Sequence, residues 1–136
     1  MGHDFGFGTS LPIPYEAAVA QVKDALKAEG FGVLTEINVQ QTLREKLGEE
    51  MAPYLILGAC NPQLAHQALE QEPDIGFLLP CNVVVRAENG GSRVDIADPQ
   101  AMLGIVGNQQ LDAIAAEAKQ RLQQALTSLS RRSHRD

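Results

Sequence analysis

The two cysteines of this 136-residue chain, Cys60 and Cys81, stand in the same local setting. Each follows an apolar run and is followed directly by an asparagine, Asn61 or Asn82. Thiols can form a disulfide, ligate a soft metal or act as nucleophiles, and a free cysteine can also pack as a small apolar side chain. Asparagine amides can hold a ligand through hydrogen bonds. These four residues are therefore the first candidates for a functional site.

Cys60 is the candidate nucleophile. The Asn61-Pro62 pair that follows it is typical of a helix start, with Asn as the cap and Pro at the first position. The partial positive charge of a helix N-terminus stabilises a nearby thiolate. Cys81, which follows Pro80 at the start of a predicted strand, is the candidate resolving thiol. A redox couple needs Cα atoms within about 7 Å, which sequence spacing does not fix, so packing of both thiols in the core stays the alternative.

His66 is the next candidate ligand, because it follows Cys60 by six residues on the same predicted helix. With two thiols it could complete a soft-metal site, but the chain has no CxxC, no HxxxH and no zinc-type spacing. We therefore expect no metal ligands and a histidine at the solvent edge of the helix. Asn61 has a structural role as a cap, whereas Asn82 stands in an apolar strand, where asparagine is disfavoured. The ligand-binding candidates are thus Cys60, Asn61, Cys81, Asn82 and His66, and the sequence identifies no cofactor.

The composition argues against several classes of function. A net charge of −6 disfavours binding to a phosphate backbone, and the one basic cluster lies at the C-terminus, in residues 131–135. No apolar run approaches the roughly 18 residues of a membrane span. The opening MGHDFGFGTS lacks the basic and apolar regions of a signal peptide. We expect a cytoplasmic protein that binds neither nucleic acid nor membranes.

No complete catalytic motif is visible in the sequence. It contains no G-x-S-x-G, phosphate-binding loop, dinucleotide fingerprint or HExxH. The first hypothesis is therefore a small ligand-binding domain without catalysis. The second is a thiol-dependent redox or sulfur-transfer protein that uses Cys60 and Cys81. Whether the protein is an enzyme stays open.

Hydrophobic periodicity predicts the elements that position these residues. Strands are predicted near residues 5–9, 32–38 and 53–60, and as a hairpin over 79–98 whose Asn89-Gly90-Gly91 turn tolerates positive φ. Helices are predicted over 12–30, 38–48, 62–72 and 108–129, with a short turn at 101–103. The apolar side chains expected to be buried on the two middle helices are Leu43, Leu47, Leu64, Ala65, Ala68 and Leu69.

This order of elements predicts one α+β domain over residues 1–130 and a frayed basic tail over 131–136. We expect a two-layer sandwich, with an antiparallel or mixed sheet and the first, third and last helices mainly on one face. The strand YLILGAC has apolar side chains on both faces, so its second face needs a cover. A homodimer is the expected cover, and a loop over residues 104–108 is the alternative.

Four blocks of the sequence carry a family resemblance: EGFGVLTEINVQQTL, YLILGACNPQLAHQAL, IGFLLPCNVVV and DPQAML. Over about residues 5–127 the chain resembles the bacterial and archaeal DUF302 family, and in particular its members with a cysteine in both the Asn-Pro and Leu-Pro blocks. The resemblance implies a TBP-like α+β domain that is dimeric in relatives. It implies no activity, because the family has no established biochemical function.

Overall fold

The computed structural model describes residues 5–135, and of residues 133–135 it describes the backbone only. Residues 1–4 and 136 lie outside the described part. The beginning of the segment considered as a signal peptide and the last residue of the basic tail therefore fall outside it.

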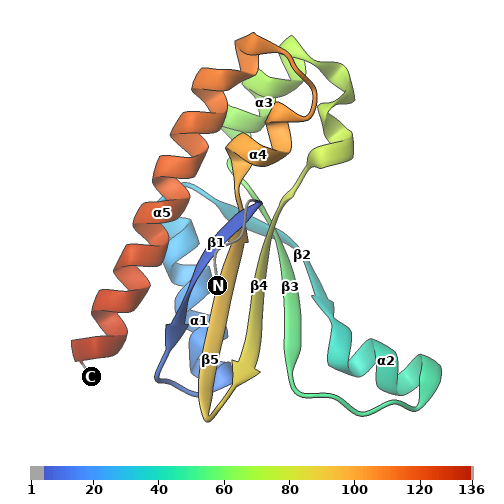
Figure 1. The fold of residues 1–136 in the computed structure, drawn as a ribbon, viewed down its shortest axis with the longest axis vertical. Helices are drawn as coiled ribbons and strands as arrows, with labels where there is room; N and C mark the ends of the chain where they lie inside the picture. The colour runs from blue at the N-terminus through green and yellow to red at the C-terminus, as the bar shows by residue number, and fades with distance from the viewer. Residues whose placement is uncertain (1–4, 136) are drawn as a thin grey trace.

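The described residues form one five-stranded sheet and a set of helices (Figure 1). The strands are β1 (Gly6–Leu11), β2 (Gly32–Asn38), β3 (Tyr54–Cys60), β4 (Cys81–Glu88) and β5 (Gly91–Ala97). The helices are α1 (Tyr15–Ala28), α2 (Val39–Leu47), α3 (Pro62–Gln71), α4 (Pro99–Gly104) and α5 (Asp112–Arg135), with short 3-10 turns η1 (Pro73–Leu78) and η2 (Gln109–Leu111). The strand order is β1-β5-β4-β3-β2, and every neighbouring pair is antiparallel. The predicted α+β sandwich is confirmed, with a purely antiparallel sheet.

Local signals end the first helix and close the hairpin as expected. Gly30 adopts φ +85° after α1, and the amide of Phe31 donates to the Leu26 carbonyl at 2.9 Å. This brings Phe31 back into the core, where it is buried. At the β4–β5 turn, Asn89 and Gly90 both have positive φ, of 47° and 81°, as the tight hairpin requires.

The main core lies between one face of the sheet and two helices. In Figure 1, α1 lies behind the strands and α5 runs along the β1 side of the sheet. Leu55 and Leu57 of β3 and Val83 and Val85 of β4 are buried in this core. The alternate residues of the same strands point to the other face, which no helix covers in Figure 1.

The third helix differs from the prediction, because it does not lie over the sheet. It packs beside α5 and α4 beyond the end of the strands (Figure 1), and its Ala68 joins a second small core with Leu103 and Leu111. The reason is that β3 ends at Cys60 and the Asn-Pro cap starts α3 at once, so the chain continues past the sheet edge. Leu69, expected to be buried, is exposed as a result.

The second helix also differs from the prediction. None of its residues, all of which the structure describes, is buried, and Leu47 is 68% exposed. In Figure 1, α2 projects from the sheet beside β2, so its apolar stripe has little to pack against. The C-terminal segment expected to fray is helical, because α5 continues through Arg135. The loop over 104–108 packs Val106 into the second core and not over the open face.

A close approach at Gly8 yields a first test of the fold. Gly8 of β1 faces Asp95 of β5, and a Cβ atom at position 8 would collide with the Val94 carbonyl oxygen and the Asp95 carboxylate. Because a backbone oxygen cannot rotate away, we expect Gly8→Ala to lower the free energy of unfolding by about 1–3 kcal/mol, measured by urea denaturation. The matched control is Gly104→Ala, where the added Cβ would meet open space apart from the backbone of its own helix and its chain neighbours. Equal midpoints for the two variants would contradict this account of β1.

Candidate functional site

The two thiols line one small cavity beyond the end of the sheet. Its walls come from β3, β4, α3, α4 and α5, and it has a volume of about 40 Å³. The register pairs Ala59 with Cys81, so Cys60 is one residue away from direct opposition to Cys81. Both cysteines are free thiols. Small-molecule sites usually measure about 300–1,000 Å³, so this cavity suits an ion or a few atoms only.

Burial opposes ionisation of both thiols. It raises the pKa of Cys60 above its ordinary value. Burial, together with the negative charge of a Cys60 thiolate, raises the pKa of Cys81 to about 11. This direction at Cys60 is opposite to the one expected from its place beside a helix N-terminus, because burial of the thiol disfavours its charged form. The thiols are therefore protonated at neutral pH.

Asn61 performs the structural role predicted for it. Its side-chain oxygen accepts a hydrogen bond from the Leu64 amide at 3.1 Å and caps α3. The residue is buried and lines the thiol cavity. Its amide nitrogen lies against Gly30, within 3.0 Å of where a Cβ atom would stand. The cap therefore also fixes the contact between the α3 start and the α1 end.

His66 and Asn82 do not join the thiols. The His66 side chain is 75% exposed and pairs at 3.7 Å with Glu70 on the same helix. Asn82 is exposed on β4, opposite Gly58, and points to the open face of the sheet. Of the five predicted ligand residues, three line the thiol cavity: Cys60, Asn61 and Cys81. His66 is exposed to solvent, and Asn82 lies on the open face of the sheet.

A groove crosses the open face where Asn82 lies. Its volume is about 610 Å³, within the range of small-molecule sites. Asn82 and Arg86 of β4 and Asp95 of β5 supply polar groups, while Tyr54 and Val84 supply apolar surface. Phe5, which precedes β1, and the segment of residues 51–53 before β3 complete the walls.

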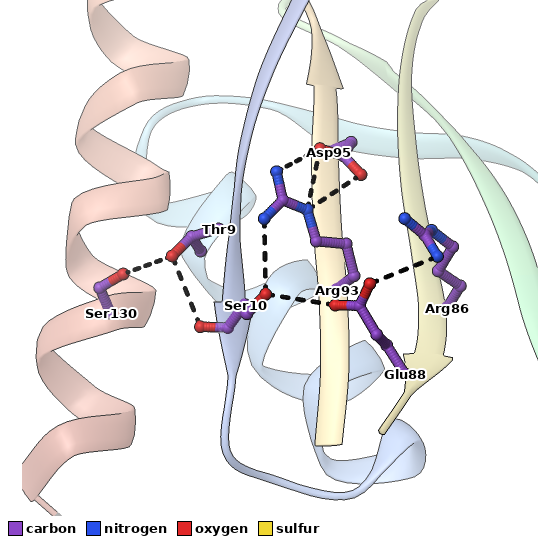
Figure 2. Close-up of polar contacts among 7 residues, drawn as sticks. All are labelled: Thr9, Ser10, Arg86, Glu88, Arg93, Asp95 and Ser130. Atoms are coloured by element: carbon purple, nitrogen blue, oxygen red, sulfur yellow. Dashed lines mark hydrogen bonds and ion pairs between the residues drawn. The ribbon is translucent and has the colours of Figure 1, made fainter. Parts of the chain in front are cut away.

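A polar network extends from this groove across β4, β5 and β1 (Figure 2). Arg93 donates hydrogen bonds to the Asp95 carboxylate, from Nη2 to Oδ1 at 3.0 Å and from Nε to Oδ2 at 3.3 Å. Ser10 bridges the network, because it donates to Glu88 at 3.2 Å and accepts from Arg93 at 3.4 Å. Glu88 then pairs with Arg86 at 3.7 Å. The network neutralises Asp95 and Glu88 and orients the two arginines on one face.

On the opposite side of β1, a second contact ties the strand to the helical layer. Thr9 and Ser130 of α5 lie 3.2 Å apart through their hydroxyl oxygens, as Figure 2 shows. The two faces of β1 therefore have separate partners, so the strand that carries Ser10 is fixed from both sides.

The sequence reasoning missed Arg86 and Asp95 as groove residues. A signal for Arg86 was present, because Asn82, Val84 and Arg86 share one face of a strand by simple alternation. Asp95 could not be found this way, since its place beside Val84 depends on the β4–β5 register.

Within residues 5–135, no helix is long and apolar enough to cross a membrane. No group of three or more His, Cys, Asp or Glu side chains that could hold a metal ion occurs among the described residues.

The fold is an antiparallel α+β sandwich in which helices cover only one face of the sheet. The family model described as a domain of unknown function, DUF302, matches residues 7–129. The crystal structure of an uncharacterized conserved DUF302 protein from Bacillus stearothermophilus is similar, with a TM-score of 0.87 and 31% identity over 93% of this chain and 99% of that chain. No curated protein matches this chain. The chain therefore belongs to the DUF302 family.

The thiol pKa values yield a test of cysteine activation. At pH 8.5, where about half of a free thiol is ionised, we expect Cys81 to react with iodoacetamide at least about tenfold more slowly than free cysteine. The measurement is the alkylation rate against pH in the variants Cys60→Ser and Cys81→Ser, each with one thiol. Because the Cys60 charge is the smaller cause at Cys81, Cys60→Ser should lower the apparent pKa only slightly from about 11. An apparent pKa for Cys60 below that of free cysteine would contradict this reasoning and favour an activated nucleophile.

Proposed function

We propose that the protein is a small cytoplasmic ligand-binding domain and that its ligand occupies the groove on the open face of the sheet. The observation that supports this proposal is the groove itself, about 610 Å³ in volume, where Asn82, Arg86 and Asp95 meet the apolar surface of Tyr54 and Val84. The cytoplasmic location is proposed because both cysteines are free thiols, which a reducing compartment preserves.

The charges in the groove favour a ligand with an acidic group and an apolar, preferably aromatic, body. The Asp95 carboxylate is already held by Arg93 at 3.0 Å. Among the described residues Arg86 pairs only with Glu88, at 3.7 Å, so most of the five N–H donors of its guanidinium remain available. Tyr54 and Val84 could pack against the apolar body, and Asn82 could donate or accept one further hydrogen bond.

The second candidate function is thiol-dependent redox or sulfur-transfer chemistry by Cys60 and Cys81. Its support is that both thiols line the same cavity. The raised pKa of each thiol works against it, because the thiolate is the reactive form. The groove is therefore the stronger proposal.

Arg86 provides the test of the groove. We expect aromatic carboxylates, with benzoate as the first probe, to shift the backbone amide resonances of β4 and β5 in an NMR titration. Removal of the charged donor in Arg86→Gln should raise the Kd by about 10- to 100-fold, since hydrogen bonds to charged groups contribute about 1.5–3 kcal/mol. Benzamide, which lacks the charge, should bind more weakly than benzoate to the unmodified protein.

The matched control for this test is Arg44→Gln on α2. Arg44 is an exposed arginine that also pairs with a glutamate, Glu50, at 3.3 Å, but it does not line the groove. Its loss should leave the Kd for benzoate unchanged. Equal effects of the two substitutions, or benzoate shifts that appear only in α5, would refute the groove as the binding site.

We further propose that the chain forms a symmetric homodimer through β2 and α2. β2 is an edge strand of the described sheet, so its outer backbone groups lack a strand partner. Around it, Leu34, Ile37 and Leu47 are large apolar side chains left exposed. A second copy related by a two-fold axis would pair like with like across this edge. The groove lies over β1, β3, β4 and β5, so it stays outside the proposed interface. The second copy would thus lie along the β2 edge, and not across the open face, where the sequence led us to expect it.

Light scattering tests the dimer. We expect a mass near twice 14.7 kDa at micromolar concentration, and near 14.7 kDa for Ile37→Glu and Leu47→Glu. Both residues are at least half exposed in the single chain, so the charge should disrupt association and not folding. Ile105→Glu, at a side chain 70% exposed next to α4, is the control that should remain dimeric. A mass of 14.7 kDa for the unmodified protein would show that the proposal is wrong.

A further inference from the structure

We propose that Cys60 and Cys81 bind one Cu(I) ion in the small cavity beyond the sheet, with Met102 as a third sulfur ligand. The inference is independent of the groove and goes beyond the proposed function. Three sulfur-bearing side chains, from β3, β4 and α4, line the same cavity of about 40 Å³. The chain has only two cysteines and three methionines, so the presence of three sulfur-bearing residues in the lining of one cavity is the observation that carries the proposal.

The register brings the two thiols within reach of one ion. Antiparallel partners have Cα atoms about 4.5–5.5 Å apart, and one residue adds about 3.3 Å along the strand, so the Cα atoms of Cys60 and Cys81 lie roughly 6 Å apart. Alternation would normally send the two side chains to opposite faces. Here β3 ends at Cys60 and the chain turns into α3, so both cysteines line one cavity.

The ligand set favours a soft monovalent ion over the common alternatives. Thiolate and thioether ligands select Cu(I), which accepts two or three sulfur ligands. Structural zinc takes four ligands, usually cysteine and histidine. Since no group of three or more His, Cys, Asp or Glu side chains occurs among the described residues, a tetrahedral zinc site lacks its ligands. At about 40 Å³ the cavity exceeds the roughly 10–15 Å³ that one water needs, so a single ion fits within it.

Charge and proton balance are consistent with this site. Cu(I) would replace the protons of both thiols, so binding releases two protons and leaves a complex with a single negative charge. The N-terminus of α3, a helix of ten residues, begins directly after Cys60 and its Asn61 cap. Its partial positive charge stabilises an anionic complex there. Because cysteine binds copper as a thiolate, copper must displace the thiol protons, and the affinity should rise with pH.

The test is an anaerobic competition for Cu(I) between the full chain and a chromogenic Cu(I) chelator. We expect one Cu(I) per chain, with close to two protons released at neutral pH. Cys60→Ser and Cys81→Ser should each weaken binding by more than about a hundredfold, since loss of an outer-shell partner alone costs about 10–100-fold. Met102→Leu, which keeps the size and apolar character of the side chain, should weaken it by about tenfold.

Met51→Leu is the matched control, because Met51 lines the groove and not the thiol cavity. It should leave copper affinity unchanged. Circular dichroism shows whether each variant is folded. If a cysteine variant unfolds, iodoacetamide-blocked native chain replaces it and should lose the copper site. The proposal is overturned if the unmodified chain fails to compete, if the Cys60→Ser/Cys81→Ser double variant or the blocked chain retains the ion, or if Met51→Leu weakens binding as much as Met102→Leu.

Discussion

The register between β3 and β4 decides which side chains of these two strands are buried and which lie on the open face. It sets Leu57 opposite Val83 and Leu55 opposite Val85, and all four are buried beneath the helices. Burial of each such side chain contributes about 1.5–3 kcal/mol, so the set contributes on the order of 6–12 kcal/mol, as much as the net stability of many domains. A slip of one residue would send this set to the open face. The pairing is therefore strongly specified, and the rest of the structure follows from it.

The division of the candidate residues is a direct consequence of this register. Cys81 stands opposite Ala59 on the helical face, whereas Asn82, the next residue, points to the open face. Two neighbouring residues of β4 thus line different sites: Cys81 lines the thiol cavity, and Asn82 lines the groove on the open face. The thiol cavity is closed by helices and small, while the groove is open and large. A change in one hollow should therefore leave the other intact, so the two proposals can be examined separately.

The open face is itself divided into two halves. Over β1, β5 and β4 it carries the network of Ser10, Arg93, Asp95 and Glu88. Because Gly8 has no side chain, the Asp95 carboxylate can lie against the β1 backbone. Around β2 and α2, the large apolar side chains Leu34, Ile37 and Leu47 are exposed. Polar groups held in fixed positions suit recognition of a ligand, because their orientation is set before binding. Exposed aliphatic side chains suit burial against a second copy.

The sequence by itself determined the elements and their ends. The cap at Asn61, the left-handed Gly30 and the Asn89-Gly90 turn act over three or four residues, so their effect can be derived from local order alone. Alternation likewise predicted which side chains of β3 and β4 share a face. The single apolar stripe on each helix also predicted a two-layer arrangement in which one sheet face lacks a helical cover.

Only the tertiary structure decided which residues meet and how they ionise. Helix α3 lies beyond the sheet and His66 faces solvent, while Met102 of α4 lines the same cavity as the two thiols. The helix N-terminus beside Cys60 predicted a lowered pKa, but burial raises it. Desolvation depends on packing by segments distant in the sequence, and the meeting of Arg86 with Asp95 depends on pairing between strands. Neither the desolvation of a thiol nor the pairing of two strands is determined within a few residues. Local patterns therefore predicted the elements but not which side chains form each site.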